Sequence, residues 1–394
     1  MTMVPSSFDR PFLFVFAGWC LLAAACASSG NSPVAGGSGG TAGGTGGGAA
    51  LDAGGGGSAS GGASGSGGAS AGTGGAGTGG GTVADAAADQ GGGTDSAPTG
   101  LTGTQMDPGT EGDGTVMQPG PYTRPPEIIG PLPGAPVGTV TDKAIYASKA
   151  AYPDRKFRYC IYVPAQYQKG KRAALMVFQD GRHYWPMGDA YMFNVATTFD
   201  NLIFRGDMPV TIAVLIDPGT PSGIYTAGGT DNQTYRSPEY DRSNPTYARF
   251  LIDEFLADVV LPNYDIVQDP DGWAIAGHSS GGSCAFAAAW NRPEKFHKVL
   301  TQNGSFNLIG DAFPGQINTT TPPKPIRAYL NSGTMDMPGW LPANMRMAAA
   351  LEAKQYHVRF QQGMGTHDPP VAAIAAFPDS LKWLWRGYKL PWYP

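Results

Sequence analysis

Long stretches of this 394-residue chain lack the residues from which a folded core is built. Between Gly30 and Gly100 there is no phenylalanine, tryptophan, tyrosine, lysine or arginine, and 30 of the chain's 59 glycines lie there. Such a composition cannot bury enough apolar surface to offset the entropy of ordering the chain. We therefore expect a disordered, Gly/Ser/Thr-rich linker over residues 27–136 and one folded domain over residues 137–394.

Basic residues are also missing early in the chain, since none lies between residues 11 and 123, where seven acidic residues occur. The formal net charge of −5 comes from that interval, because residues 124–394 hold 25 basic against 23 acidic residues. A near-neutral domain offers no positive surface for a polyanion, so nucleic acid is excluded as a partner.

The N-terminal apolar run, residues 11–25, is too short to span a bilayer and is typical of a signal peptide. Small residues directly before Cys26 resemble a bacterial lipobox, in which the cysteine thiol receives a lipid. We expect a signal peptide over residues 1–26 with a lipobox-like cleavage site, lipidation of Cys26, and an exported, membrane-anchored lipoprotein that is periplasmic or on the cell surface. An ordinary cleaved signal, giving a secreted protein, is the alternative.

Only two cysteines remain in the domain, Cys160 and Cys284, and both have apolar neighbours. We expect free buried thiols, with a disulfide as the alternative.

Short runs rich in β-branched and aromatic residues alternate with helical segments in the domain. This order predicts an α/β fold with a mostly parallel central sheet and helices on both faces. In such sheets the active site lies beyond the carboxyl ends of the strands. The expected strands are 157–163, 174–178, 211–216, 272–276, 298–301, 326–330 and 357–360, and the clearest helices are 247–260 and 343–353.

Ser279 lies in the segment 277–282, GHSSGG, between the expected strand 272–276 and a helix over 283–290. A G-x-S-x-G turn in this context exposes a nucleophilic serine, and its glycines avoid collisions with neighbouring backbone. The N–H of Ser280 would be one donor of an oxyanion hole. The same pattern occurs in the linker, at 36–40 and 68–72, but with no strand before it and no helix after it.

A serine needs a base, and His367 lies where the base belongs in chain order, in a glycine-rich loop between the last strand and the C-terminal helix. Asp336, after the strand 326–330, is the acid expected to accept the Nδ1–H of this histidine. Asp311 is an alternative acid, and Asp368 is expected to cap the following helix. The other four histidines lie beside the serine or beside strands: His183, His278, His297 and His357.

A second oxyanion donor is expected from the turn after the strand 174–178, at the backbone N–H of Gly181 or Arg182. An ordinary turn glycine is the alternative.

Five segments together resemble the esterase D and enterochelin-esterase-like branch of the α/β-hydrolases, which includes feruloyl and acetylxylan esterases. The resemblance covers most of the domain and implies an α/β-hydrolase fold and hydrolysis of carboxylic esters through an acyl-serine, with no cofactor or metal. It assigns no substrate-binding residue. The segments are 178–181 (FQDG), 236–241 (RSPEYD), 277–282 (GHSSGG), 333–336 (GTMD) and 365–367 (GTH).

Within these segments, Arg236 has two interpretations. Its charge can pair locally and order the loop before the helix 247–260, or it can grip a carboxylate of the substrate.

We expect a serine carboxylic-ester hydrolase acting outside the cytoplasm on a small-molecule or polysaccharide ester, either an acylated carbohydrate or a phenolic ester. Loops 217–245 and 306–325 should border its cleft. Three alternatives stay open: a siderophore esterase, an acyltransferase on the same scaffold, and a non-catalytic surface binding module. Aromatic residues that could stack on a substrate are Tyr184, Trp185, Tyr225, Tyr235 and Trp340.

Overall fold

A ten-stranded sheet forms the centre of the protein. The computed structural model describes residues 102–185 and 193–393. Its sheet strands are β2 (Gly114–Gln118), β3 (Thr139–Val140), β4 (Ala144–Ala147), β5 (Lys156–Val163), β6 (Ala174–Gln179), β7 (Thr211–Ile216), β8 (Trp273–His278), β9 (Lys298–Gln302), β10 (Arg327–Met335) and β11 (Val358–Thr366). They follow the order β2-β11-β10-β9-β8-β6-β7-β5-β3, and β4 also pairs with β5. The pairs from β2 to β7 are parallel, whereas β5 is antiparallel to β7, β3 and β4.

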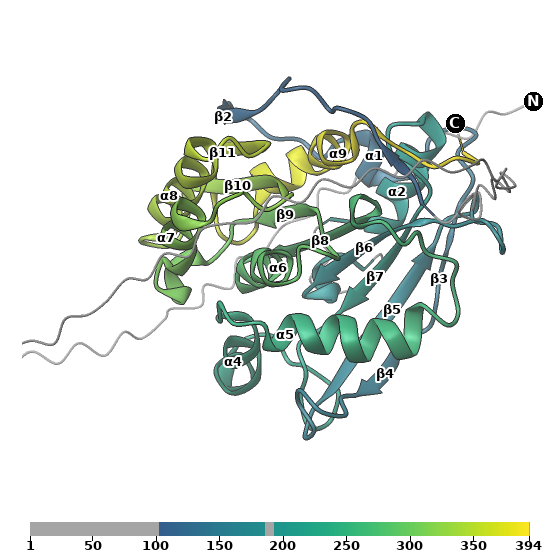
Figure 1. Cartoon of the computed structure of the whole chain (residues 1–394), viewed down its shortest axis with the longest axis horizontal. Helices are drawn as coiled ribbons and strands as arrows, with labels where there is room; N and C mark the ends of the chain where they lie inside the picture. The colour runs from purple at the N-terminus through teal and green to yellow at the C-terminus, as the bar shows by residue number, and fades with distance from the viewer. Residues whose placement is uncertain (1–101, 186–192, 394) are drawn as a thin grey trace, which may run out of the picture. The chain divides into compact units, whose positions relative to one another are not determined.

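Helices cover both faces of this sheet. In Figure 1, α1, α2 and α9 lie on one face, and α5, α6 and α8 lie on the other. This arrangement confirms the expected α/β-hydrolase architecture. The helix bounds are α1 (Pro126–Ile129), α2 (Val195–Arg205), α5 (Thr246–Arg249), which continues into the π-helical η3 (Phe250–Val260), α6 (Ser280–Asn291), α7 (Ala312–Thr319), α8 (Trp340–Ala353) and α9 (Val371–Trp385).

Shorter helical turns lie in the connections. They are η1 (Gly181–His183), α3 (Gly229–Asp231), η2 (Asn232–Arg236), α4 (Ser237–Tyr240), η4 (Pro270–Gly272) and η5 (Phe306–Ile309). Two further strands, β1 (Thr104–Gln105) and β12 (Tyr388–Lys389), pair with each other outside the central sheet.

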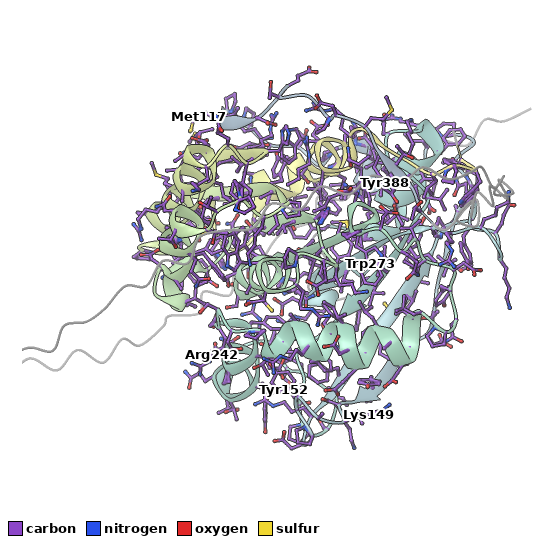
Figure 2. The ribbon with its side chains drawn as sticks, in the orientation of Figure 1. Met117, Lys149, Tyr152, Arg242, Trp273 and Tyr388 are labelled. Atoms are coloured by element: carbon purple, nitrogen blue, oxygen red, sulfur yellow. The ribbon has the colours of Figure 1, made fainter. Side chains whose placement is uncertain are left out.

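The core lies on both sides of the central strands. Every residue of β6, β7 and β8 is buried, because helices cover both faces, and this is why their sequences are nearly continuous apolar runs. Trp273, labelled in Figure 2, is the first residue of β8 and is buried. Beside β5, the rings of Phe157 and Phe250 stack with their centroids 3.9 Å apart.

The folded part begins earlier than residue 137, where the sequence placed its boundary. β2 pairs in parallel with β11 and adds a strand to the sheet, and Met117 projects from it at the margin of the molecule (Figure 2). The Asn201 side chain of α2 bonds the backbone of Glu127 and Leu132. The sequence missed these elements because β2 is short and α1 is a single turn held by contacts from elsewhere. The earlier part of the expected linker, with the signal peptide and Cys26, lies outside the described residues.

Both domain cysteines are buried free thiols, Cys160 on β5 and Cys284 on α6, as expected. Across residues 102–185 and 193–393, no helix has both the length and the apolar character required to cross a bilayer.

Candidate active site

Ser279 forms the turn between β8 and α6. Its backbone has φ 63° and ψ −130°, a region that residues other than glycine rarely occupy and that is typical of a nucleophile elbow. The flanking glycines are required: a Cβ atom on Gly277 would collide with the backbone of Gly281, and one on Gly281 would lie 2.7 Å from Oδ2 of Asp180. The collision expected for Gly277 is thus confirmed.

β10 and β11 are neighbours, and they bring together the predicted acid and base. Nδ1 of His367 donates to Oδ1 of Asp336 at 2.8 Å. The Asp336 side chain is fully buried, whereas that of His367 is 17% exposed. A carboxylate at Nδ1 sets the tautomer of the imidazole and leaves Nε2 to accept a proton.

The two other aspartates considered for the site have different partners. Asp311 pairs with Arg346 at 2.6 Å on the surface. Asp368 does not cap α9, because Pro370 is the N-cap residue and no side chain bonds the first turn of that helix. The capping expectation was therefore wrong.

The loop that carries His367 is docked onto the elbow. Nε2 of His278, the residue before Ser279, donates to the carbonyl oxygen of His367 at 3.2 Å, and the two rings lie 4.8 Å apart. Trp340, at the start of α8, packs edge-on against the His367 ring at 4.3 Å. Within the described part of the chain, no hydrogen bond joins the Ser279 hydroxyl to His367. In enzymes without bound substrate this bond is often long.

His183 and His278 form a buried pair beside the base, which sequence reasoning missed. Their ring centroids lie 5.5 Å apart. Burial lowers the pKa of His183 to about 3 and that of His278 well below its ordinary value, so both are neutral near pH 7. Their closeness in sequence to Gly181 and Ser279 is the one signal that could have indicated them. The other two histidines each bond a carboxylate at 2.8 Å, His297 with Asp271 and His357 with Asp113.

The backbone N–H of Arg182 is not available as an oxyanion donor. It donates to Oδ1 of Asp217 at 3.0 Å, while the other oxygen of this carboxylate accepts from Arg158 at 2.7 Å. Asp217 follows β7, which pairs with β6, so it lies next to the turn that carries Arg182. The expectation for Arg182 is corrected, because its N–H already has a charged acceptor.

Gly181 and Ser280 remain as candidate oxyanion donors. A Cβ atom on Gly181 would lie 2.6 Å from the backbone nitrogen of Ile216, which explains why glycine is required in this turn. β6 and β8 are adjacent and parallel, so Gly181 and Ser279 follow neighbouring strands at the same edge of the sheet. Ser280 is the first residue of α6, and its N–H is one of those that a helix leaves unbonded.

Arg236 binds Asp180, whose carboxylate lies beside Gly281 of the elbow. Its Nε and Nη2 donate to the two oxygens of Asp180 at 2.8 and 2.6 Å, and both side chains are buried. Burial would raise the pKa of Asp180, but the guanidinium outweighs burial and holds that pKa below its ordinary value. The structural interpretation of Arg236 therefore holds, although its partner lies after β6 and not within its own segment.

The predicted aromatic residues do not share one surface. Trp340 contacts the His367 ring, as described. The others lie elsewhere: Tyr184, Trp185 and Tyr225 are buried, and Tyr235 packs against the Arg155 guanidinium.

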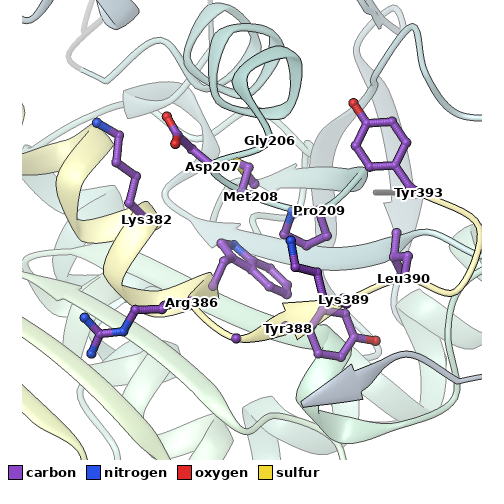
Figure 3. Close-up of a pocket in the computed structure, with 12 residues that line it drawn as sticks. Gly206, Asp207, Met208, Pro209, Lys382, Arg386, Tyr388, Lys389, Leu390 and Tyr393 are labelled. Carbon is purple, nitrogen blue, oxygen red and sulfur yellow. The ribbon is translucent and has the colours of Figure 1, made fainter. Parts of the chain in front are cut away.

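Two cavities differ in their position relative to these residues. One, of about 550 Å³, adjoins the ends of β10 and β11 and includes Met335 and Thr366, the neighbours of Asp336 and His367. The other, of about 310 Å³, lies before the first residue of β7, at the end of the strands opposite the candidate site. Its lining includes Asp207, Lys382, Arg386, Lys389 and Tyr393 (Figure 3). Only the first is near the candidate site.

The assembled groups are suited to nucleophilic attack on an acyl carbon. They are a hydroxyl on a strained turn, an imidazole bonded to a carboxylate, and backbone N–H donors. Among residues 102–185 and 193–393, no cluster of histidine, cysteine, aspartate and glutamate side chains could hold a metal ion.

The chain matches the family described as Esterase over residues 150–383, which is more than half of its length. No curated protein matches it. The sequence resemblance to esterases is thus confirmed at the level of the family.

Several solved structures share the fold. An enterochelin esterase from Shigella flexneri has a TM-score of 0.52 and 21% identity, covering 67% of this chain and 62% of its own. The enterobactin esterase from Shigella flexneri, in the presence of enterobactin, has a TM-score of 0.51 and 20% identity, covering 65% and 60%. A CE1 ferulic acid esterase from Anaeromyces mucronatus, in complex with ferulic acid, has a TM-score of 0.51 and 17% identity, covering 67% and 96%. The chain thus spans about 60% of the enterobactin esterase chains.

Proposed function

The chain belongs to the esterase family, a family of carboxylic ester hydrolases, and from this membership we propose that Ser279, His367 and Asp336 form its catalytic triad. The observation that carries the proposal is the 2.8 Å bond between His367 and Asp336, in a loop that His278 ties to the elbow. Ser279, Asp336 and His367 directly follow β8, β10 and β11, so they lie at the carboxyl ends of parallel strands of one sheet.

The mechanism follows from the roles of these groups. Nε2 of His367 takes the proton of the Ser279 hydroxyl as its oxygen attacks the acyl carbon of the ester, and Asp336 stabilises the imidazolium that forms. The N–H groups of Gly181 and Ser280 stabilise the negative oxygen of the tetrahedral intermediate. The imidazolium then protonates the departing alcohol. Water attacks the acyl-serine in the second half of the cycle, with His367 again as base, and the acid is released.

For the substrate, we propose an acylated carbohydrate or a phenolic ester. The neighbour that binds ferulic acid supports a phenolic acyl group. The enterobactin esterases support a second candidate, a catecholate siderophore ester. Both rest on a shared fold at low identity, so a substrate panel must separate them.

We also propose that the enzyme acts outside the cytoplasm, held to a membrane by a lipid on Cys26. The apolar run at residues 11–25 and the small residues before Cys26 support export and anchoring. The change Cys26→Ala should release the protein from the membrane pellet, and continued sedimentation of this variant would reject the anchor.

The triad is tested by hydrolysis of p-nitrophenyl acetate with the full chain. Ser279→Ala should lower kcat by about 10⁴-fold or more, the loss typical of a triad member. Thr139→Ala, at an exposed hydroxyl residue on β3, the last strand in the sheet order, is the matched control and should retain full activity. Equal rates for Ser279→Ala and the natural chain would refute the nucleophile. Rates with feruloylated, acetylated and catecholate esters then rank the substrates.

A further inference from the structure

A third cavity, of about 220 Å³, lies where β9 and β10 begin, at the end of the strands opposite the candidate triad. Its lining comes from segments that precede or open strands, whereas the triad residues follow strands. Among the described residues that line it, three are cationic, Lys298, Lys324 and Arg327, and Asp271 is the one acid. The cavity is therefore a separate site with an excess of positive charge.

Two of these cations lie side by side and are buried. Lys298 and Arg327 are paired across the parallel strands β9 and β10, so both side chains are on the same face of the sheet. Lys298 is 1% exposed and Arg327 is 7% exposed. The acceptors of the Lys298 ammonium are uncharged, the side chain of Gln105 and the carbonyl oxygen of Asp271. Two neighbouring cations out of water are destabilising unless an anion compensates their charge.

The guanidinium of Arg327 has donors without acceptors. It lies over the Trp383 indole, 3.7 Å from the ring centroid, and its Nε donates to the carbonyl oxygen of Trp383 at 3.1 Å. Nη1 and Nη2 are buried, and neither has a hydrogen-bond partner in the described part of the chain. Burial lowers the pKa of Arg327 only to about 10, so the group is charged at neutral pH. A buried group of this kind indicates the position of a bound ion or water, and its N–H groups match the two oxygens of a carboxylate.

The carboxylates near the cavity are bonded to histidines. Asp271 bonds His297 at 2.8 Å, and Asp113 bonds His357 at 2.8 Å. The charge of Asp113 acts on Arg327 and raises its pKa, but the two side chains form no ion pair across residues 102–185 and 193–393. The protein's own acids therefore leave the Nη atoms of Arg327 unbonded.

We propose that this cavity binds a small organic carboxylate, whose oxygens accept hydrogen bonds from Arg327 and whose charge is compensated by Arg327 and Lys298. A cavity of about 150 Å³ holds benzene, so one of about 220 Å³ holds benzoate. The apolar part of the lining favours an alkyl or aryl carboxylate over an inorganic anion. It includes Pro323, Pro325, Ile326 and Tyr356.

The binding site does not depend on the triad, and carboxylic acids are also the class of product that the proposed reaction releases. The test is isothermal titration calorimetry of benzoate into the full chain. Benzoate should bind with a Kd of about 1 mM or lower. Benzamide, which has nearly the same shape and no charge, should bind at least about tenfold more weakly, and so should inorganic phosphate.

Variants of the guanidinium make the outcome specific. Arg327→Gln should weaken benzoate binding by at least about tenfold, and Arg327→Lys, which keeps the charge without the planar fork, should recover part of the affinity. Arg346→Gln removes a surface guanidinium that pairs with Asp311 outside the cavity and should leave the affinity unchanged. If Arg327→Gln does not fold, Arg327→Lys and the benzamide comparison still decide the question.

Three results would overturn the proposal. They are equal affinity for benzoate and benzamide, tighter binding of phosphate than of benzoate, and a benzoate affinity that the Arg327 variants leave unchanged or that Arg346→Gln lowers equally. No ester is hydrolysed in these titrations. Loss of the proposed esterase activity would therefore leave this site standing, and failure to bind benzoate would leave the triad standing.

Discussion

His278 and His367 lie ring against ring, with their centroids 4.8 Å apart, and the first donates a hydrogen bond to the backbone carbonyl of the second. Since His278 directly precedes Ser279, the elbow itself holds the loop that carries the base. Burial keeps His278 neutral by lowering its pKa well below the ordinary value. A second positive charge beside His367 would oppose the imidazolium that forms when Ser279 loses its proton.

The first prediction concerns this contact. His278→Ala should lower kcat for ester hydrolysis by about 10- to 100-fold, because the base loses its anchor and a displacement of about 1 Å is costly in catalysis. His278→Gln, which keeps an N–H donor, should recover part of the loss. His297→Ala removes a histidine from the other end of the sheet and should have little effect on kcat. A fully active His278→Ala enzyme would show that the stack does not position the base.

The second prediction concerns the acid. Asp336→Asn should lower kcat by about 10⁴-fold, since an amide no longer stabilises the imidazolium and allows the wrong tautomer. The matched control is Asp311→Asn, at the aspartate that pairs with Arg346 on the surface. Steady-state kinetics on p-nitrophenyl acetate measure both. If the losses were reversed between the two variants, the assignment of Asp336 would be wrong.

The third prediction concerns the elbow glycines. Gly277→Ala should destabilise the protein by about 1–3 kcal/mol or prevent its folding, because the new methyl group collides with the backbone of Gly281. Gly315→Ala is the control, since its methyl group would meet nothing within 4 Å in α7. It should stabilise the protein by about 0.4–1 kcal/mol. Unfolding in urea measures both changes, and tolerance of Gly277→Ala would contradict the described turn.

The fourth prediction is a pH dependence of stability. His183 has a folded-state pKa of about 3 because of burial. Between about pH 6.5 and pH 3 the unfolded chain therefore binds a proton on this residue that the folded chain does not. The unfolded state then binds more protons, so stability rises with pH and falls on acidification, by about 1.4 kcal/mol per pH unit. Urea unfolding at several pH values should show a shallower fall in His183→Gln, and identical slopes would argue against a buried neutral histidine.

The fifth prediction concerns the domain boundary. A chain that begins at residue 102 should unfold at the temperature of the full chain. One that begins at residue 137 should unfold at least about 10 °C lower or aggregate, because it lacks β2 and leaves the edge of β11 exposed. Thermal unfolding followed by circular dichroism compares the two. Equal unfolding temperatures would mean that β2 and α1 add little to stability.

Much of this site could be predicted from the sequence, because short motifs and the order of strands and helices along the chain indicate which residues follow which strand. The segment around Ser279 lies between a strand and a helix, and His367 and Asp336 follow the last two long strands. In a parallel α/β sheet, residues that directly follow the strands lie together at the carboxyl ends of the strands, whatever the conformation of the connecting loops. Other assignments depended on contacts between distant segments. The N–H of Arg182 is taken by Asp217, and Arg236 pairs with Asp180, a partner 56 positions away.

The sequence by itself determined the kind of fold and the order of the chemical groups, because periodicity and glycine spacing are read over a few neighbouring residues. Only the tertiary structure decided that the N–H of Arg182 is already bonded, that β2 belongs to the sheet, and that two neutral histidines lie beside the base. These features arise where segments far apart in the chain pack together, and the free energy of such packing depends on both partners at once.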